Sequence, residues 1–595
     1  MSLTHRIIQG PRRVVLAACT LFVVAACDTT TPPPVTTVPT GPITFVKNPC
    51  TGPDTLSMTL AQSTLVDCSN GGTTLTLAGN GASYVIVPQF PTDLVDDLPA
   101  IYSLASGDLP AGSVSLRRVS PRLVTGGGTP GVLPARQNWT LQRRFTGALH
   151  SPAHLRQIAA SRAASAAISG PSFAVSPPPP LGSTRSFHVA SSASTNAFKT
   201  VTASLQYVGS NILLYIDTSA PTGGFTSTQL TDFGQYFDQT LYAIDSTAFG
   251  QPSDVDQNGH VIMLMSPVVN GITPTAQCES EGFVAGFFEP EDFGGASDPA
   301  SNQGEIFYSI VPDPNGTFSC PHTVDDVGSS LPATFVHELQ HLINYSQHVI
   351  VHGGEAESSW LDEGLSIIAE ELGSLYYEQR CPAPACRTDP SQIFPDSAEG
   401  FVGDFLYDSY QYALLPDTAS LTLHVDSDDG FAWRGGDWLL MRWLGDQFGS
   451  SLFRKFETGP ADGLTNIQTE TGQSFTSLFA SFGLSLYTDS LPGLPRTTAP
   501  AIDRFASRNV RQLWARLYAT SGPASDIPTS VPLILFPIST DTSAAVLNPG
   551  TMSFYRLDTP ASSAAVTIRF SGQTGTPLAG ILHPQLAVFR LPPGQ

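Results

Sequence analysis

One short run, His337-Glu338-Leu339-Gln340-His341, has the residue types and spacing to hold a metal ion. On an α-helix, residues four apart lie on the same face, so both imidazoles can reach a single Zn²⁺. Glu338 then flanks the ion, where a carboxylate can take a proton from water. The apolar residues around the run indicate a buried helix. Buried polar side chains need partners, and a metal supplies them.

A catalytic zinc site takes three protein ligands and keeps one position for water. The third candidate is Glu363, in the segment 359–366, which has the pattern of a second helix start. A short linker brings this helix back beside the first one. The alternative is that Glu363 is a first-turn carboxylate that favours the helix dipole, with Ser359 as the N-cap. Glu355 and Glu357 are competing ligands in a Gly-led connection, where we expect them to be solvated.

The strings HELQH (337–341) and WLDEGLS (360–366) together resemble the gluzincin metallopeptidases, and most of all the hyicolysin-like family. The match is sharp over 332–371 and weaker over 198–491. The resemblance implies that His337, His341 and Glu363 bind one Zn²⁺ per chain and that Glu338 is the general base. It also implies a zincin-like α+β catalytic domain, with a mixed-sheet subdomain and a helical subdomain.

A gluzincin usually supplies a Tyr or a His from the helical half of its cleft to stabilise the oxyanion of the tetrahedral intermediate. The candidates that we name are Tyr410 and His424. Tyr407 and Tyr412 are also available, and no motif selects among the four.

The resemblance therefore predicts a zinc-dependent endopeptidase that hydrolyses polypeptide substrates with a water activated by Glu338. The export signal described below makes it extracytoplasmic. Two alternatives stay open. One is a non-catalytic surface adhesin or binding protein on a zincin fold, although such a protein would have no need of the base. The other is an exported aminopeptidase. The G-x-M-E-N string of the aminopeptidase branch does not occur in this sequence, which favours an endopeptidase.

The N-terminus has the pattern of an export signal, with basic residues ahead of an apolar core that is too short to span a membrane. Residues 1–26 end in Val-Ala-Ala before Cys27, which resembles a bacterial lipobox with Cys27 as the lipidation site. Residues 27–42 form a Thr/Pro tether. We expect a lipid anchor in the bacterial cell envelope, facing outside the cytoplasm. The alternative is a plain secretory signal and a secreted protein.

Composition agrees with export. The chain has 28 basic and 50 acidic residues, a net charge of -22, which argues against a nucleic-acid partner. Six cysteines follow the signal, an even set in an oxidising compartment. Proximity in the sequence predicts the disulfide pairs Cys50–Cys68, Cys278–Cys320 and Cys381–Cys386.

The remaining domain boundaries follow from patterning. We predict a multidomain chain in which N-terminal and C-terminal β-domains flank the catalytic domain. The segments are a small β-sandwich-like domain (43–108), a basic and Pro-rich segment (109–183), the metallopeptidase domain (184–522) and a C-terminal β-domain (523–595). The basic segment is either a linker or a pro-segment that covers the catalytic cleft until it is cut.

Two further features precede the metal run. Asp254, Asp256 and Asn258 lead into a Gly turn with a spacing typical of calcium loops, so Ca²⁺ is a second candidate cofactor. The alternative is an Asx-rich turn. The strand at 304–311 is the last before the metal helix. By the resemblance it would be the edge strand that pairs with extended substrate, and otherwise it is an internal strand.

Overall fold

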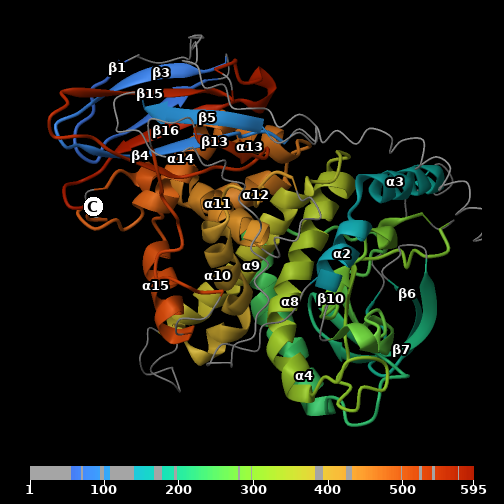
Figure 1. Ribbon diagram of the computed structural model, residues 1–595. Coiled ribbons are helices and arrows are strands. Elements are labelled where there is room, and N and C mark those ends of the chain that lie inside the picture. The colour runs from blue at the N-terminus through green and yellow to red at the C-terminus, as the bar shows by residue number, and fades with distance from the viewer. Residues whose placement is uncertain are drawn as a thin grey trace, which may run out of the picture. The chain divides into compact units, whose positions relative to one another are not determined.

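The computed structural model describes residues 55–68, 71–93, 100–106, 140–166, 177–192, 197–278, 282–295, 298–381, 393–423, 432–496, 499–521, 526–538, 543–573 and 575–595. All of them fall within the stretch Lys47–Gln595, which forms one unit. The fold in this unit is mixed α and β, with three sheets and a helical region (Figure 1).

Strands from the two ends of the chain form two five-stranded sheets. The first has the order β1 (Thr55–Leu56), β3 (Thr73–Ala78), β15 (Ala565–Gly572), β5 (Ala100–Ser106) and β13 (Ser543–Leu547). The second has the order β12 (Phe536–Pro537), β14 (Tyr555–Asp558), β4 (Ser83–Gln89), β16 (Gln585–Arg590) and β2 (Ser63–Asp67). Buried and half-buried residues alternate along β3, as in a strand with one face on a core. Leu75 and Leu77 of the first sheet share one buried cluster with Ile86 and Val588 of the second, so the sheets form a sandwich.

This sandwich corrects the expectation of separate N-terminal and C-terminal β-domains. β15 lies between β3 and β5, and β16 lies between β4 and β2. Figure 1 shows these blue and red strands side by side. Neither terminal segment completes a sheet alone. Alternation along one strand predicts that the strand exists, but it does not identify a partner at the other end of the chain.

The third sheet lies in the predicted catalytic region and has six strands. Its order is β10 (Gly286–Phe288), β11 (Ile306–Ser309), β9 (Val261–Met265), β8 (Ile212–Asp217), β7 (Phe198–Val208) and β6 (Thr184–Ala190). The central strands β11, β9 and β8 are parallel, and the outer ones are antiparallel to their neighbours. All five residues of β9 are buried, as is typical of a central parallel strand.

The expected edge strand is an internal one. β11 covers part of the segment 304–311, and it pairs with β9 on one side and with β10 on the other. The outer strand on this side is β10, which pairs with β11 alone among the described strands. β10 has only three residues, so its sequence gives no strand signal that could have placed it outside β11.

Some helices of this region pack against the sheet, and the later ones form the helical part. Those before the metal run and at the run itself are α4 (Ser227–Tyr236), α5 (Tyr242–Ala248), α6 (Pro267–Asn270), α8 (Val324–Tyr345) and α9 (Ser359–Arg380). Of these, α4, α6 and α8 pack against the sheet. The later ones are α10 (Glu399–Leu414), α11 (Ala432–Phe448), α12 (Ser451–Glu457), α13 (Gly463–Thr471), α14 (Phe475–Thr488) and α15 (Val510–Ser521). π-helical turns are η1 (Phe237–Leu241) and η4 (Ser346–Val351), and 3₁₀ turns are η2 (Thr275–Gln277), η3 (Pro290–Phe293), η5 (Asp396–Ala398), η6 (Ala501–Asp503) and η7 (Gly580–Leu582).

Part of the basic segment also folds. Residues 140–166 form α2 (Thr140–Leu149) and α3 (Pro152–Ala166), a pair that we call the arm. Figure 1 shows α2 beside β10. The side chain of Gln142 pairs with this strand region, because its Nε2 donates to Gly286 O at 2.8 Å and its Oε1 accepts from Ala285 N at 2.9 Å. Residues 107–139 lie outside the described residues.

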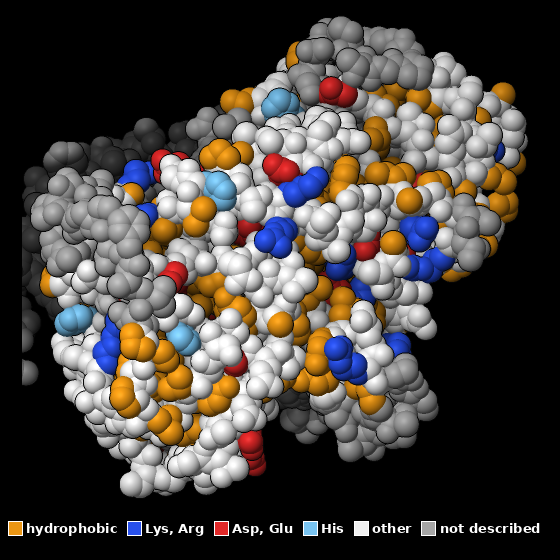
Figure 2. All heavy atoms as spheres, turned by 180° about the vertical axis from the view of Figure 1, so that it is seen from behind, with side chains coloured by type: hydrophobic (Ala, Val, Ile, Leu, Met, Phe, Trp, Pro, Cys, Tyr) orange, Lys and Arg blue, Asp and Glu red, His pale blue; other side chains and the backbone are white. Residues whose placement is uncertain are grey.

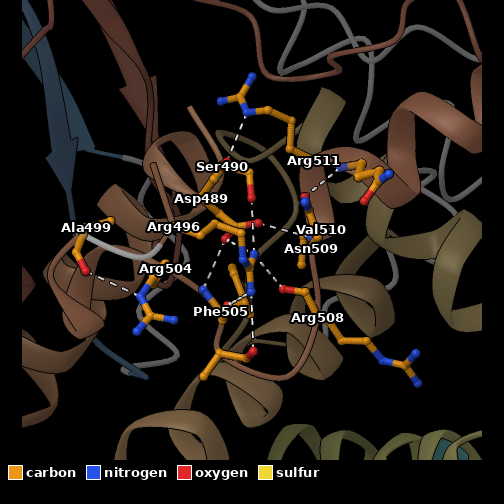
Figure 3. A network of polar contacts seen from close by, with 12 residues as sticks. Asp489, Ser490, Arg496, Ala499, Arg504, Phe505, Arg508, Asn509, Val510 and Arg511 are labelled. Carbon is orange, nitrogen blue, oxygen red and sulfur yellow. Dashed lines mark hydrogen bonds and ion pairs between the residues drawn. The ribbon is translucent and has the colours of Figure 1, made fainter. Parts of the chain in front are cut away.

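A buried carboxylate anchors α9. Glu371 accepts hydrogen bonds from Arg508 Nε at 2.7 Å and from Arg442 Nη1 at 3.3 Å. Burial alone would raise the pKa of Glu371, but the two guanidinium groups bring the pKa below its usual value. Arg508 belongs to an ordered loop in which Arg496 Nη1 donates to Asp489 Oδ1 at 2.7 Å and to Arg508 O at 3.0 Å (Figure 3). The helix that carries Glu363 is therefore fixed to two other elements.

The disulfide Cys278–Cys320 is confirmed. Cys381 is also disulfide-bonded. The expected partners of Cys381 and Cys68, which are Cys386 and Cys50, lie outside the described residues. The other two pairings stay predictions.

Charged side chains on the face shown in Figure 2 are scattered among hydrophobic and uncharged ones. Within the described ranges, none of the helices has the length and apolar content to cross a membrane.

Candidate metal centre

α8 positions the first two candidate ligands. Thr323 begins the helix with a capping box, in which its Oγ1 accepts from Asp326 N at 3.1 Å and Asp326 Oδ2 accepts from Thr323 N at 2.8 Å. Every residue from 335 to 346 is buried. His337 and His341 face each other from consecutive turns, with their Nε2 atoms 3.1 Å apart.

α9 packs on α8 and brings Glu363 to the same point. Glu363 Oε2 lies 3.7 Å from His337 Nε2, and Glu363 Oε1 lies 3.9 Å from His341 Nε2. Ligand atoms of the three side chains all lie within 4.8 Å of one another, close enough to hold one metal ion. The structure thus brings together the three residues that the sequence predicts as ligands.

The carboxylates beside the two rings fit a metal. His337 Nδ1 lies 2.7 Å from Glu370 Oε1, and His341 Nδ1 lies 2.9 Å from Asp362 Oδ2. A carboxylate at this distance favours the proton on Nδ1, which leaves a lone pair on each Nε2. Two facing lone pairs 3.1 Å apart repel each other, and either a metal ion or a shared proton between the two Nε2 atoms removes that repulsion. The nitrogen and carboxylate donor set is one that Zn²⁺ accepts.

Arg434 of α11 balances the charge of this centre. Its Nε lies 3.9 Å from Glu363 Oε2, and its Nη2 lies 3.7 Å from Glu370 Oε1. Burial alone would raise the pKa of Glu363, but Arg434 and the two histidines bring that pKa below its usual value. Burial, His341 and Arg434 together lower the pKa of His337 well below its usual value. An ionised carboxylate and a neutral imidazole are the forms that bind a metal.

Glu338 is oriented by the outer strand of the sheet. Its Oε2 accepts from Phe288 N at 2.8 Å. Burial raises the pKa of Glu338 to about 7, against the opposing effect of His341. A carboxylate whose pKa lies near neutral pH can both accept and release a proton, as a general base must.

Sequence reasoning missed the partners of the histidines. Asp362 lies in the predicted helix start at 359–366, and no pattern there marks it as a partner of His341. Glu370 lies seven residues after Glu363 and thus on the same face of α9, a spacing that could have marked it. Arg434 had no comparable signal, because it comes from a helix far along the chain.

The connection between α8 and α9 also differs from expectation. Glu355 is exposed, as predicted, but Glu357 is buried. Glu357 accepts hydrogen bonds from Gly463 N and from Asn466 Nδ2, so it joins α9 to α13 and does not face solvent. The N-cap of α9 is Ser358, one residue before the expected Ser359.

The candidate calcium loop is closed by its own hydrogen bonds. Asp256 accepts from Asn258 N at 3.2 Å and from Asn258 Nδ2 at 2.7 Å, and Asp254 Oδ1 accepts from Gly259 N at 3.1 Å. Asp254 and Asp256 lie close to Glu305, a buried carboxylate that the sequence had not singled out. These bonds are those of an Asx-rich turn, and calcium binding stays a prediction.

Tyr410 does not have a free hydroxyl for an oxyanion. Its Oη donates to Thr529 O at 2.5 Å and accepts from Thr529 N at 3.1 Å. Both bonds fix the hydroxyl to the chain after α15, and the role of Tyr410 as an oxyanion stabiliser stays a prediction. His424 and Cys27 lie outside the described residues.

His150, from the arm, has its ring 5.3 Å from that of His341, a neighbour that the sequence did not suggest.

No family model matches the chain. Over 179 residues the chain is 28% identical to the neutral metalloprotease ShpI of Staphylococcus hyicus. The match covers 30% of this chain and 37% of that protein, so the chain spans well under half of the relative's length. The chain is thus a distant and partial homologue of a metalloprotease, and its buried His and Glu groups are placed so that they could bind a metal.

Proposed function

We propose that this chain is a zinc-dependent endopeptidase that hydrolyses polypeptide substrates. The observation that carries the proposal is the convergence of His337, His341 and Glu363, with a separate carboxylate behind each imidazole. Structural carboxylates of this kind fix the tautomer and orientation of metal-binding histidines. The partial likeness to a metalloprotease supports the same reading.

The roles of the residues follow from their environments. His337, His341 and Glu363 would hold the Zn²⁺. When bound, the ion supplies a Lewis acid that polarises the peptide carbonyl and acidifies water. Glu338 takes the proton of the attacking water and returns it to the leaving amine, and Phe288 N keeps its carboxylate aimed while it does so.

The decisive experiment measures zinc content and casein hydrolysis on the full chain, on two test variants and on one control variant. Glu338→Gln should keep zinc and lose about 100- to 10,000-fold in turnover, because only the proton acceptor is removed. His337→Ala should lose activity and the zinc ion held by His337, His341 and Glu363. Glu355→Gln is the matched control, since it changes an exposed carboxylate in the adjoining connection.

Retained activity in Glu338→Gln would overturn the proposed role of that residue. Zinc in the wild type without hydrolysis would favour the adhesin or binding-protein alternative. A peptide with a blocked N-terminus separates the remaining alternative. An endopeptidase cleaves the blocked peptide, whereas an aminopeptidase needs a free α-amino group.

We also propose that the chain is exported and anchored through Cys27, on the sequence pattern of residues 1–27 alone. Cys27→Ser should move the protein from the membrane fraction to the soluble fraction. An unchanged distribution, or a mature N-terminus elsewhere than at Cys27, would contradict the anchor.

A further inference from the structure

A second cluster of metal-binding side chains lies where the arm meets the sheet. His154 comes from α3, Glu289 directly follows β10, and Glu291 lies in η3. His154 Nε2 is 3.7 Å from Glu289 Oε1 and 3.7 Å from Glu291 Oε2. The three residues offer ligand atoms within 4.8 Å of one another, and none of them belongs to the candidate metal centre.

The cluster is buried, and its polar atoms lack partners. The exposed fractions of His154, Glu289 and Glu291 are 8%, 2% and 6%. Among the described residues, no group hydrogen-bonds to His154 Nε2, Glu289 Oε2 or Glu291 Oε2. In the part of the chain that the structure describes, the one hydrogen bond to Glu289 Oε1 comes from Glu291 N, at 3.3 Å. Three orphaned atoms at one buried point need an explanation, because each such atom ordinarily costs folding free energy.

Charge points to a cation as that explanation. In the described ranges, His154 is the one basic group that forms an ion pair with either glutamate. Asp298 adds a further negative charge beside Glu291. Two buried carboxylates at one point carry a negative charge that one divalent ion would balance.

The distances agree with ligands around an ion and not with direct hydrogen bonds. A separation of 3.7 Å is too long for a hydrogen bond. Ligands that each lie about 2.1 Å from a tetrahedral ion are roughly 3.4 Å apart. We propose that His154, Glu289 and Glu291 bind a second divalent transition-metal ion, of the class represented by Zn²⁺, and that this ion fastens the arm to the outer edge of the sheet. The imidazole selects this class, because Ca²⁺ and Mg²⁺ prefer oxygen ligands.

The test counts zinc in the full chain after dialysis against buffer with trace Zn²⁺. We expect two ions per wild-type chain, one in the double variant Glu289→Gln/Glu291→Gln, and one in His337→Ala. The number of zinc ions per chain is measured without reference to turnover, so the second site can be tested even if the chain is not a peptidase. One zinc in the wild type, or two in the double variant, would overturn the proposal. If the double variant does not fold, His337→Ala decides, since loss of all zinc there would overturn the second site.

Trypsin tests whether the ion fastens the arm. Arg156 is an exposed site on α3. We expect slow cleavage there with Zn²⁺ and at least tenfold faster cleavage after chelation. His337→Ala should keep this zinc protection, because it retains the second site. Equal rates with and without Zn²⁺ in His337→Ala would contradict the fastening role. Protection by Ca²⁺ and not by Zn²⁺ would contradict the assigned class of metal.

Discussion

At the scale of single residues, the two candidate histidine ligands differ from ordinary buried histidines because each has its own carboxylate on the far side of the ring. Glu370 lies behind His337, and Asp362 lies behind His341. Each carboxylate keeps the ring oriented and its Nε2 available. The quality of the metal site therefore depends on residues that would not touch the metal.

This dependence gives a prediction for Glu370→Gln. The variant keeps the size of the side chain but loses the charge that holds the proton on His337 Nδ1. We expect the affinity for zinc to fall about 10- to 100-fold, with the fold intact. Competition against a fluorescent zinc chelator measures this. The control is Glu355→Gln, and an affinity equal to that of the wild type would show that Glu370 does not support the ligand.

A second residue predicts how stability changes with pH. Asp245 of α5 is fully buried, and neither carboxylate oxygen has a hydrogen-bond partner among the described residues. Burial alone raises the pKa of Asp245 well above its usual value of 3.8. The folded state therefore binds this proton more tightly than the unfolded state. Stability from the protonated form is present below the unfolded pKa and is lost as pH rises towards the folded pKa.

Asp245→Asn should remove the loss of stability that Asp245 causes at high pH, because asparagine does not ionise. We expect the variant to be about 1–3 kcal/mol more stable than the wild type at pH 8 and close to it at pH 4. Urea unfolding at both values measures the difference. The exposed Asp232→Asn is the control. A variant that is equally destabilised at both pH values would mean that the Asp245 carboxyl makes a stabilising contact in the folded state.

The sequence predicted the three ligands and the base as residues that should converge, because a four-residue spacing and a nearby helix start are local patterns. It did not predict Arg434, which reaches the centre only through the packing of α11 on α9. It also did not predict the partner of the Tyr410 hydroxyl, because that partner, Thr529, is distant in sequence. Local chemistry is readable from such patterns, whereas pairings made by tertiary packing are not.

At the scale of elements, the important relation is between β10 and the arm. β10 is the outer strand, and its Phe288 N donates to the candidate base. At the start of this strand, the side-chain amide of Gln142 is hydrogen-bonded to Gly286 O and Ala285 N. An amide side chain offers the same donor and acceptor as a peptide unit, so Gln142 occupies positions that an extended substrate could use. In the pro-segment hypothesis, the arm would therefore block substrate by occupying these backbone groups of the outer strand. This hypothesis stays a prediction.

Gln142→Ala tests whether the arm competes with substrate. If it does, losing two hydrogen bonds should raise kcat/KM about three- to tenfold on an extended peptide, mainly through a lower KM. Gln157→Ala changes an exposed amide on the same arm and is the control. A fall in kcat/KM in Gln142→Ala alone would mean that the arm helps to build the substrate site.

At the scale of the whole chain, the sandwich joins the two ends of the sequence and also meets the helical region. Gln89 Nε2 of β4 donates to Ala480 O of α14 at 3.4 Å. A Cβ at Gly483 of α14 would lie 2.9 Å from Met552 Sδ, so helix and sandwich approach closely there. The predicted boundary near residue 522 therefore separates segments that depend on each other.

Truncation at that boundary gives the sharpest test of this dependence. A chain that ends at residue 522 lacks β15 and β16, each of which pairs with a strand on both sides in its sandwich sheet. We expect β2 to β5 to lose their pairing and their shared core, and the protein to be recovered mostly insoluble or rapidly degraded by trypsin. A chain that lacks only Pro593–Gln595 ends beyond β16 and should stay soluble. An independent C-terminal β-domain predicts instead a soluble truncated chain with its zinc retained. Soluble yield and zinc content, measured on the same preparations, decide between these two outcomes. Soluble yield reports on the sandwich, and zinc content reports on the candidate metal centre.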